Sequence, residues 1–253
     1  MCVVPNKCER PDTGVTPDTS PPQDVVSEPV VDSSPTPDAS DASDGGGGCP
    51  TTGLLAWWKG DGDASDVQGF LPLSPKNTLT YASAHLNLGF NLDGSSYLEG
   101  SGANAQLSGL SAITIEGWIN PTNLSAPGVI FSRRAATAAK GFMFYVASGK
   151  LNFAGNGSSI GANTTLAVST PHHVAVTSDG VTVTFYVDGV ADGSGGGAAI
   201  GDDAVDALVG ATWATASTQT FQFVGWIDEL AIYSKALSAS QISSLKGGSP
   251  KCN

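Results

Sequence analysis

Two adjacent carboxylates, Asp228 and Glu229, lie within the apolar segment FVGWIDELAIY near the C-terminus. Charged residues make up only 13% of the chain, so an acidic pair in an apolar segment needs a chemical or structural explanation. Glycoside hydrolysis requires two carboxylates on either side of one bond, roughly 5 to 9 Å apart. Adjacent side chains of a β-strand point to opposite faces, so we do not expect this pair to act together on one sugar.

Strand alternation assigns the two carboxylates to different sides of a sheet. Asp228 shares its parity with Leu230 and Ile232, which predicts that it points toward the core and is hydrogen-bonded or metal-bound there. Glu229 shares its parity with Ile227 and is predicted to face the other way. We therefore interpret the pair as two separate residues, with Asp228 as a structural anchor.

Other catalytic patterns are incomplete in the sequence. The pattern G-x-S-x-G occurs once, as GSSIG at residues 157–161, but no helix is predicted after it as in a nucleophile elbow, and Glu116 stands alone on its predicted strand. His172 and His173 are adjacent, so at most one of them can point into a given site. We expect one of these imidazoles to be packed or hydrogen-bonded and the other to be exposed. The sequence therefore predicts a protein that is not an enzyme.

A second group of carboxylates, Asp61, Asp63 and Asp66, lies in the turn-rich segment GDGDASD. Oxygen-rich loops of this kind can bind a hard cation such as Ca²⁺. The segment lacks the glycine at position six and the terminal glutamate of an EF-hand loop, so that motif is absent. The alternative is that Asp61 and Asp63 are only solvated and that Asp228 accepts hydrogen bonds from backbone N–H groups.

The four cysteines, Cys2, Cys8, Cys49 and Cys252, lie near the two ends of the sequence. Domain termini are often close in space, which favours a disulfide between Cys49 and Cys252. Cys2 would then pair with Cys8 or be modified; a cysteine at this place before a Pro/Asp/Ser-rich segment is also typical of a bacterial lipoprotein anchor. No C-x-x-C zinc spacing occurs, so disulfides in an oxidising compartment are the expected state.

Composition divides the chain into a segment at residues 1–8 with two cysteines, a linker at residues 9–48 and a domain at residues 49–253. The linker is rich in Pro, Asp, Ser and Gly and has no aromatic residue, so it is predicted to be disordered. The net charge of −12 leaves no basic stripe, and we expect no nucleic-acid partner. No apolar stretch reaches 18 residues, so no transmembrane helix is predicted.

The domain is predicted to consist of short strands. The segment at residues 172–191, HHVAVTSDGVTVTFYVDGVA, alternates apolar and polar side chains and contains two Asp-Gly turn signals, which predicts three strands in a meander. One short helix is predicted after Ser238, which has Gln241 three residues later as in a capping box. The predicted fold is all-β, a two-sheet antiparallel sandwich with one short C-terminal helix.

On these residues the domain resembles the laminin G-like, concanavalin A-like jelly-roll family. Five segments match the family's motifs in order: GLLAWWKGDGDASDVQG, FNLDGSSYLEG, AITIEGWINP, PHHVAVTSDGVTVTFYVDGV and FVGWIDELAIYSKALSASQI. Pro171 stands where the family usually has Trp. The resemblance implies two packed antiparallel sheets of jelly-roll topology, often in extracellular proteins. It does not identify a ligand, because this fold serves many functions.

The resemblance also implies a structural Ca²⁺, since laminin G-like domains commonly hold one with a few acidic side chains and backbone carbonyls. By position, Asp66 and Asp228 are the best candidate ligands, with Asp93 as a third. Sugar binding would instead need an exposed aromatic side chain. Trp213, between strands, and Tyr186, on the polar face of its strand, are predicted to be exposed and to bind the ligand.

We interpret the chain as a non-catalytic extracellular or cell-surface module for binding or adhesion. Its expected partner is a carbohydrate or a surface protein. One alternative is a glycoside hydrolase or lyase on the same sandwich fold, and another is a purely structural domain that binds proteins. A carboxylate pair on one face of a cleft would favour the hydrolase, and no such pair is found in the sequence.

Overall fold

The computed structural model describes residues 52–100, 104–135, 140–215 and 217–247. The two N-terminal segments predicted from composition, residues 1–8 and 9–48, lie outside the described residues, as do all four cysteines. No helix in the described ranges is long and apolar enough to cross a membrane.

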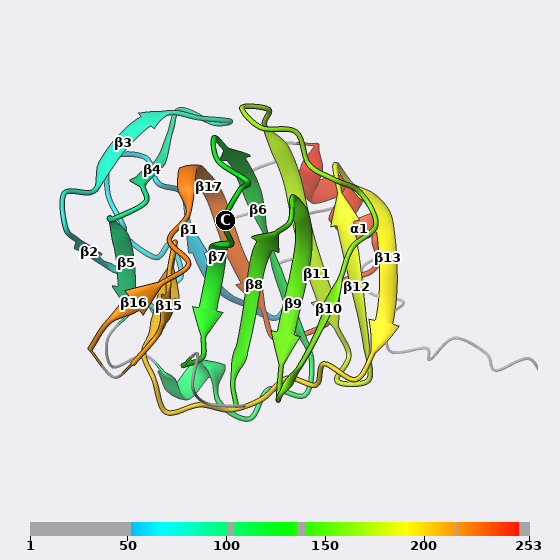
Figure 1. The fold of residues 1–253 in the computed structure, drawn as a ribbon. Coiled ribbons are helices and arrows are strands. Elements are labelled where there is room, and N and C mark those ends of the chain that lie inside the picture. The colour runs from blue at the N-terminus through cyan, green and yellow to red at the C-terminus, as the bar shows by residue number, and fades with distance from the viewer. Residues whose placement is uncertain (1–51, 101–103, 136–139, 216, 248–253) are drawn as a thin grey trace, which may run out of the picture. The chain divides into compact units, whose positions relative to one another are not determined.

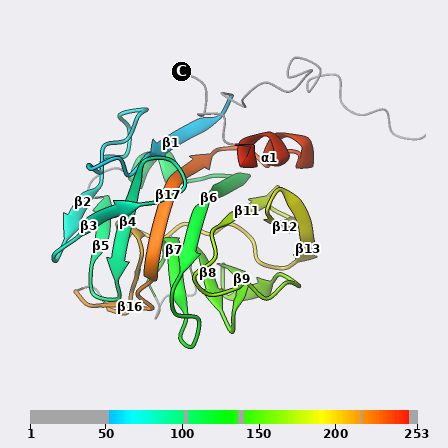
Figure 2. The same cartoon turned by 90° about the horizontal axis from the view of Figure 1, so that it is seen from above.

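Two antiparallel sheets form a sandwich, which confirms the predicted fold class (Figures 1 and 2). In sheet A the described strand order is β13 (Val190–Gly196), β12 (Thr182–Val187), β11 (His172–Ser178), β6 (Ile113–Pro121), β17 (Val224–Tyr233), β4 (Leu88–Asp93) and β3 (Thr80–Ser83), with β1 (Leu54–Trp58) paired to β17. In sheet B it is β10 (Ser158–Gly161), β9 (Lys150–Gly155), β8 (Phe142–Ala147), β7 (Gly128–Arg133), β14 (Ala207–Val209), β5 (Tyr97–Gly100) and β2 (Ser74–Lys76).

Three smaller elements complete the described part of the chain. They are the ribbon of β15 (Thr212–Trp213) and β16 (Gln219–Thr220), the 3₁₀ turn η2 (Asn104–Leu107) and the helix α1 (Ala239–Lys246). The helix lies on the side of sheet A away from β7, β8 and β9 (Figure 2). We call the face of each sheet that points away from the other sheet its outer face.

The meander predicted from the Asp-Gly signals is confirmed as β11, β12 and β13. In the first turn, the Asp179 carboxylate accepts hydrogen bonds from the N–H groups of Val181 and Thr182. In the second turn, Asp188 and Gly189 both have positive φ, at 51° and 79°. Two consecutive residues of this conformation match the right-handed twist of the paired strands, which is why Asp-Gly closes hairpins so often.

The core between the sheets contains a row of aromatic rings. Trp58 from β1 lies 6.1 Å, ring centre to ring centre, from Phe131 on β7. Phe131 is 6.1 Å from Phe142 on β8, which is 6.4 Å from Phe153 on β9. Each of these side chains is fully buried. Burial of large apolar side chains between two sheets is the main favourable contribution to the stability of such a sandwich.

The helix α1 covers part of the outer face of sheet A. Its predicted capping box is present, because Ser238 and Gln241 exchange side-chain to backbone hydrogen bonds. The buried side chains Ile242 and Leu245 pack in one apolar cluster with sheet residues, among them Tyr186. Tyr186 is only 6% exposed, so the prediction that it is exposed is wrong. It is on the outer face as expected, but the helix covers that face there.

A β-bulge interrupts β17 at the acidic pair. The register with β6 shifts between Asp228 and Ala231, and Glu229 has φ of +52°. Ile227 and Leu230 therefore both point into the core, although strict alternation would place them on opposite faces. An extra residue in one strand resets its alternation in this way.

The bulge places both carboxylates on the outer face of sheet A, so the predicted separation onto two faces is wrong. Asp228 is opposite Trp118 and accepts a 2.8 Å hydrogen bond from the N–H of Leu86 in the β3–β4 loop. Glu229 accepts a 2.7 Å hydrogen bond from the indole N–H of Trp57. Both carboxylates are buried. Asp228 is therefore an anchor as predicted, but one that holds a covering loop on the outer face.

The carboxylate of Asp66 organises the loop that follows β1. One of its oxygens accepts hydrogen bonds from the N–H groups of Trp57 and Gln68, and the other accepts from Phe70 and Leu71. The four distances are between 2.8 and 3.0 Å. The hydrogen bonds from Trp57 and Leu71 are buried, so these two N–H groups would have no comparable partner without Asp66.

Replacement of Asp66 by Ala is expected to destabilise the domain by about 3 kcal/mol or more. The substitution leaves buried N–H groups without an acceptor, and each such loss costs about 1 to 3 kcal/mol. Asp66→Asn, which keeps one acceptor oxygen, should lie between the wild type and Asp66→Ala. Urea denaturation gives these free energies. Asp63→Ala removes an exposed carboxylate from the same loop and is the matched control; an equal loss of stability in both Ala variants would contradict the role of Asp66.

Replacement of Asp228 by Asn is expected to stabilise the protein above neutral pH. Burial raises the pKa of the Asp228 carboxyl from 3.8 to about 7. The hydrogen bond from Leu86 lowers this pKa, and the negative charge of Glu229 raises it by a smaller amount. A carboxyl with a raised pKa favours folding below pH 4 and loses that contribution as the pH rises through 7. Asn keeps an oxygen for the Leu86 N–H and has no charge to bury.

The advantage of Asp228→Asn over the wild type should grow by about 3 kcal/mol between pH 5 and pH 8.5, since the folded pKa of about 7 lies two units above pH 5 and one unit corresponds to about 1.4 kcal/mol. Urea denaturation at both values measures the change. Asp63→Asn also removes one negative charge and should show no such trend. A constant difference between Asp228→Asn and the wild type at the two pH values would show that Asp228 is already ionised at pH 5 in the folded protein.

Candidate functional site

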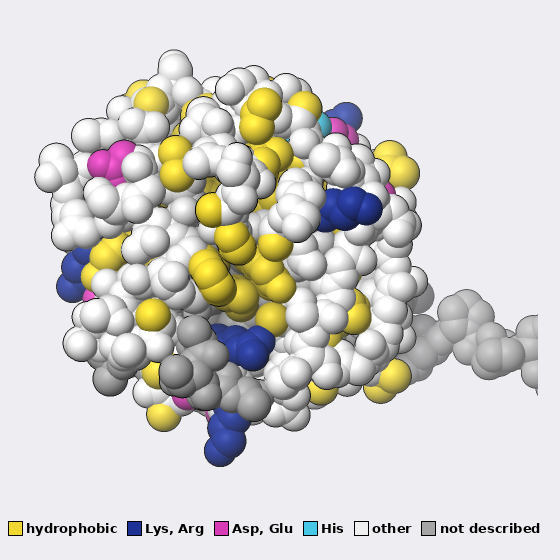
Figure 3. Space-filling view, in the orientation of Figure 1, with side chains coloured by type: hydrophobic (Ala, Val, Ile, Leu, Met, Phe, Trp, Pro, Cys, Tyr) yellow, Lys and Arg dark blue, Asp and Glu magenta, His cyan; other side chains and the backbone are white. Residues whose placement is uncertain are grey.

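A groove crosses the outer face of sheet B, the sheet that is in front in Figure 1. Its volume is about 290 Å³. The strands β8 and β9 supply its base, because their alternate residues Phe144 and Phe153 point into the core and leave Met143 and Ala154 on the outer face. Hydrophobic side chains form a band over the middle of this face (Figure 3). The groove is therefore an apolar strip on an otherwise polar sheet surface.

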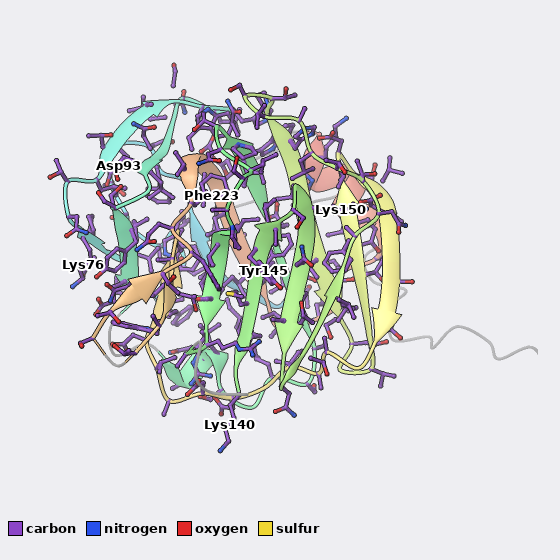
Figure 4. The ribbon with its side chains drawn as sticks, viewed as in Figure 1. Lys76, Asp93, Lys140, Tyr145, Lys150 and Phe223 are labelled. Atoms are coloured by element: carbon purple, nitrogen blue, oxygen red, sulfur yellow. The ribbon has the colours of Figure 1, made fainter. Side chains whose placement is uncertain are left out.

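Two aromatic side chains border the groove. Tyr145, near the middle of the face in Figure 4, comes from β8, and its hydroxyl lies 2.9 Å from the hydroxyl of Ser159 on β10. Phe221 comes from the segment between β16 and β17 and is 38% exposed. Large apolar side chains next to hydroxyl groups are typical of sites that bind ligands with both apolar and polar surfaces.

Phe221 is held in an unusual backbone conformation. Its φ is +55°, a region that bulky residues rarely adopt, and its carbonyl accepts a 2.9 Å hydrogen bond from the N–H of Val129 on β7. The hydrogen bond fixes the segment against sheet B and so keeps an exposed aromatic ring at the groove. Backbone strain of this kind is concentrated at functional sites, which supports a binding role for Phe221.

The polar side of the groove is formed by hydroxyl groups and one cation. Ser158 and Ser159 lie on β10, and Thr212 lies on β15. The Thr212 hydroxyl donates a 2.8 Å hydrogen bond to the carbonyl of Arg134, and Arg134 is itself one of the lining residues. No carboxylate is among the described residues of the lining. The groove can therefore offer stacking, hydroxyl hydrogen bonds and a positive charge.

Trp213, the other predicted ligand-binding aromatic, is 9% exposed and does not line the groove. Its indole N–H donates a 2.9 Å hydrogen bond to the carbonyl of Asp206, and its ring packs with Leu208 and Ala211. The prediction that it is exposed is wrong, because the ribbon of β15 and β16 folds it back onto the domain. Its neighbour Thr212 reaches the groove instead.

The structure assigns the exposed aromatic role to residues that the sequence analysis missed. In β8, with the sequence FMFYVA, Phe142 and Phe144 point into the core while Met143 and Tyr145 point outward. An antiparallel strand with a solvated outer face normally has polar residues there. A strand that is apolar on both faces is therefore a signal in the sequence. No comparable signal in the sequence indicates Phe221.

The three carboxylates predicted to bind Ca²⁺ do not form one site. Asp66 has both oxygens occupied by backbone N–H groups, and Asp93 accepts hydrogen bonds from the backbone and hydroxyls of Ser95 and Ser96. These bonds lower the pKa of the Asp93 carboxyl far below its usual value. No group of three His, Cys, Asp or Glu side chains in the described ranges is arranged for a metal. A calcium site stays a prediction, and these residues do not fit one.

The paired histidines differ in their surroundings. His173 is fully buried, as predicted for one of the two, and its Nε2 lies 3.1 Å from a carboxylate oxygen of Glu116. His172 is not exposed as expected; it is partly buried, with Nδ1 2.9 Å from a carboxylate oxygen of Asp188. The Glu116 and His173 side chains are at most 1% exposed, so a substrate cannot reach this pair in the folded domain.

Solved structures with a similar fold include a domain of an arabinanase and binding domains of toxins. One is domain 4 of AbnA, a GH43 extracellular arabinanase from Geobacillus stearothermophilus, which was solved in complex with arabinotriose. Its TM-score is 0.62 and its sequence identity is 21%, and the match covers 76% of this chain and 98% of the AbnA domain. The receptor binding domain of the botulinum neurotoxin C/D mosaic serotype has a TM-score of 0.60 at 14% identity and covers 78% of this chain.

The binding domain of Paraclostridial Mosquitocidal Protein 1 has a TM-score of 0.61 at 16% identity and covers 77% of this chain. This chain spans about half the length of the two toxin domains, 51% and 52%. At these identities the likeness concerns the fold alone. No curated protein matches the sequence.

Residues 92–243, which run from the end of β4 into α1, match the family model described as the concanavalin A-like lectin/glucanases superfamily. The match includes more than half of the chain, contains the residues that line the groove and agrees with the two-sheet sandwich. The chain therefore belongs to the concanavalin A-like lectin/glucanase superfamily.

Proposed function

We propose that this chain is a non-catalytic module that binds a glycan in the groove on the outer face of sheet B. The observation that carries the proposal is the combination of Tyr145 and exposed, strained Phe221 with the hydroxyls of Ser158 and Ser159 on β10. A sugar has one apolar face and a rim of hydroxyls, so it needs an aromatic surface and hydrogen-bonding groups close together. These are the two kinds of groups that the groove presents.

The chemistry of the groove supports binding without catalysis. Glycosidases in most families use two carboxylates that flank the scissile bond, and none of the described lining residues is acidic. The adjacent pair Asp228 and Glu229 is buried on sheet A and hydrogen-bonded to Leu86 and Trp57. These carboxylates are therefore engaged in holding the fold, on the sheet opposite the groove.

The similar structures support a recognition role. One of them is a domain of an arabinanase in complex with arabinotriose, and others are receptor-binding domains of toxins. Binding to a target is the property that these descriptions share. Because the fold alone does not determine a ligand, the groove residues carry the proposal and the fold makes it consistent.

The proposal includes a location outside the cell or on its surface, which rests on the sequence. Residues 9–48 would act as a spacer, and Cys2 would be lipid-modified or disulfide-bonded. A disulfide between Cys49 and Cys252, and one between Cys2 and Cys8, would suit an oxidising compartment. A module held away from a surface by such a spacer would be free to contact a polysaccharide or a neighbouring cell.

Removal of either aromatic ring is expected to weaken glycan binding roughly tenfold, since truncation of a central aromatic contact costs about 1 kcal/mol or more. Calorimetry with arabinotriose, and with any oligosaccharide that an array of immobilised polysaccharides identifies, would measure the affinities of Phe221→Ala and Tyr145→Ala. Phe221→Ala should change the melting temperature little, because the Phe221 side chain is 38% exposed and alanine keeps the Cβ on which the cost of a positive φ depends.

Phe70→Ala is the matched control for Phe221→Ala. Phe70 is 54% exposed and does not line the groove, so its removal should leave glycan affinity unchanged. Chromatography of the bound oligosaccharides after long incubation tests for cleavage. Equal loss of binding in Phe70→Ala and Phe221→Ala would contradict the location of the site, and release of shorter sugars would contradict a non-catalytic module.

A further inference from the structure

The groove differs in charge from the rest of the domain. Residues 49–253 contain 14 acidic and nine basic side chains, yet the charged residue among the described lining of the groove is a cation, Arg134. On the face shown in Figure 3, Lys and Arg side chains are more prominent than acidic ones. Figure 4 labels three of these lysines, Lys76, Lys140 and Lys150, around the same face. The face is therefore more positive than the net charge of the protein predicts.

Arg134 sits beside a second arginine that is neutralised within the fold. Arg133, at the end of β7, is 2% exposed and pairs with Asp202, and it also donates to the carbonyl of Leu107. Arg134 is partly exposed, and within the described ranges no carbonyl or side chain accepts a hydrogen bond from its guanidinium. Asp203, in the same loop as Asp202, accepts from the backbone N–H of Ala135. The nearby carboxylates thus bind the Arg133 guanidinium and a backbone N–H group. The Arg134 side chain is therefore available to a ligand in the groove.

The backbone on both sides of Arg134 is fixed. Its carbonyl accepts from the Thr212 hydroxyl, and Ala135 forms a bridge with Trp213. A guanidinium on a fixed backbone is well placed to bind a planar or tetrahedral oxyanion through two parallel N–H donors. Such a bond is stronger beside an apolar groove floor than in open water, because the local dielectric constant is lower.

Building on the proposed function, we infer that the groove selects a glycan that carries an anionic group, either a uronate carboxylate or a sulfate ester. Arg134 binds the anionic group, and Tyr145 and Phe221 pack against the sugar ring. The net charge of −12 repels a dense polyanion at long range, whereas one short-range cation suits a chain with separated charges. The ligand class is thus an acidic oligosaccharide and not a nucleic acid.

The test compares charged and neutral sugars on the full chain by calorimetry. The probes are trigalacturonic acid, its methyl-esterified neutral form, a sulfated chondroitin oligosaccharide and arabinotriose. The wild type should bind one of the two acidic probes at least tenfold more tightly than either neutral probe. Arg134→Gln should weaken binding of that acidic probe by roughly tenfold to a hundredfold and change binding of neutral probes by less than about twofold. Arg134→Lys should retain part of the affinity, because it keeps the charge but loses the fork of donors.

Lys150→Gln is the matched control, since it removes a cation from the same face outside the groove lining and should leave every affinity unchanged. Melting curves of Arg134→Gln and the wild type should coincide.

If the wild type prefers neutral probes, or if Arg134→Gln weakens the binding of neutral and acidic probes equally, the anionic ligand class is wrong while the glycan-binding groove stands. If no glycan binding by the wild type is sensitive to Phe221→Ala, the proposed function itself is wrong. Preference for the uronate or for the sulfated probe identifies the anion.

Discussion

The architecture depends on one strand, β17, that changes its neighbour without leaving sheet A. Val224–Ile227 pair with β4, Leu230–Tyr233 pair with β1, and β6 pairs with β17 on both sides of the bulge. The bulge at Asp228 and Glu229 lies where the neighbour changes. Because an extra residue resets the alternation, Ile227 and Leu230 can both face the core. The two halves of sheet A are joined continuously as a result.

The bulge also explains why the outer face of sheet A is closed. It turns two carboxylates onto that face, where Asp228 holds the β3–β4 loop and Glu229 holds Trp57. The helix α1 covers the adjoining apolar cluster. Burial of carboxylates is costly unless they are hydrogen-bonded, and these bonds meet that requirement in part. The two carboxylates in this part of the protein therefore hold structural elements together.

The outer face of sheet B differs from that of sheet A in the side chains that it exposes. Met143 and Tyr145 face outward there, and the strained Phe221 adds an exposed ring. The described lining has hydroxyls and Arg134 but no carboxylate. A protein with an excess of acidic residues thus presents an apolar and positive groove on one sheet, while its buried acids lie on the other. This separation of structural and recognition chemistry between two sheets is the basis for the proposed glycan-binding role.

Local pattern in the sequence was enough to predict the strands, the Asp-Gly hairpins, the capped helix and the two-sheet class, because each depends on neighbouring residues. The faces of Asp228 and Glu229 and the burial of Tyr186 and Trp213 depended on contacts distant in sequence. Alternation cannot reveal a bulge, since the bulge follows from the partners of β17. Nor can it show that a helix covers one outer face and leaves the other open. The sequence determined which elements form, and tertiary packing alone decided which side chains remained available for binding.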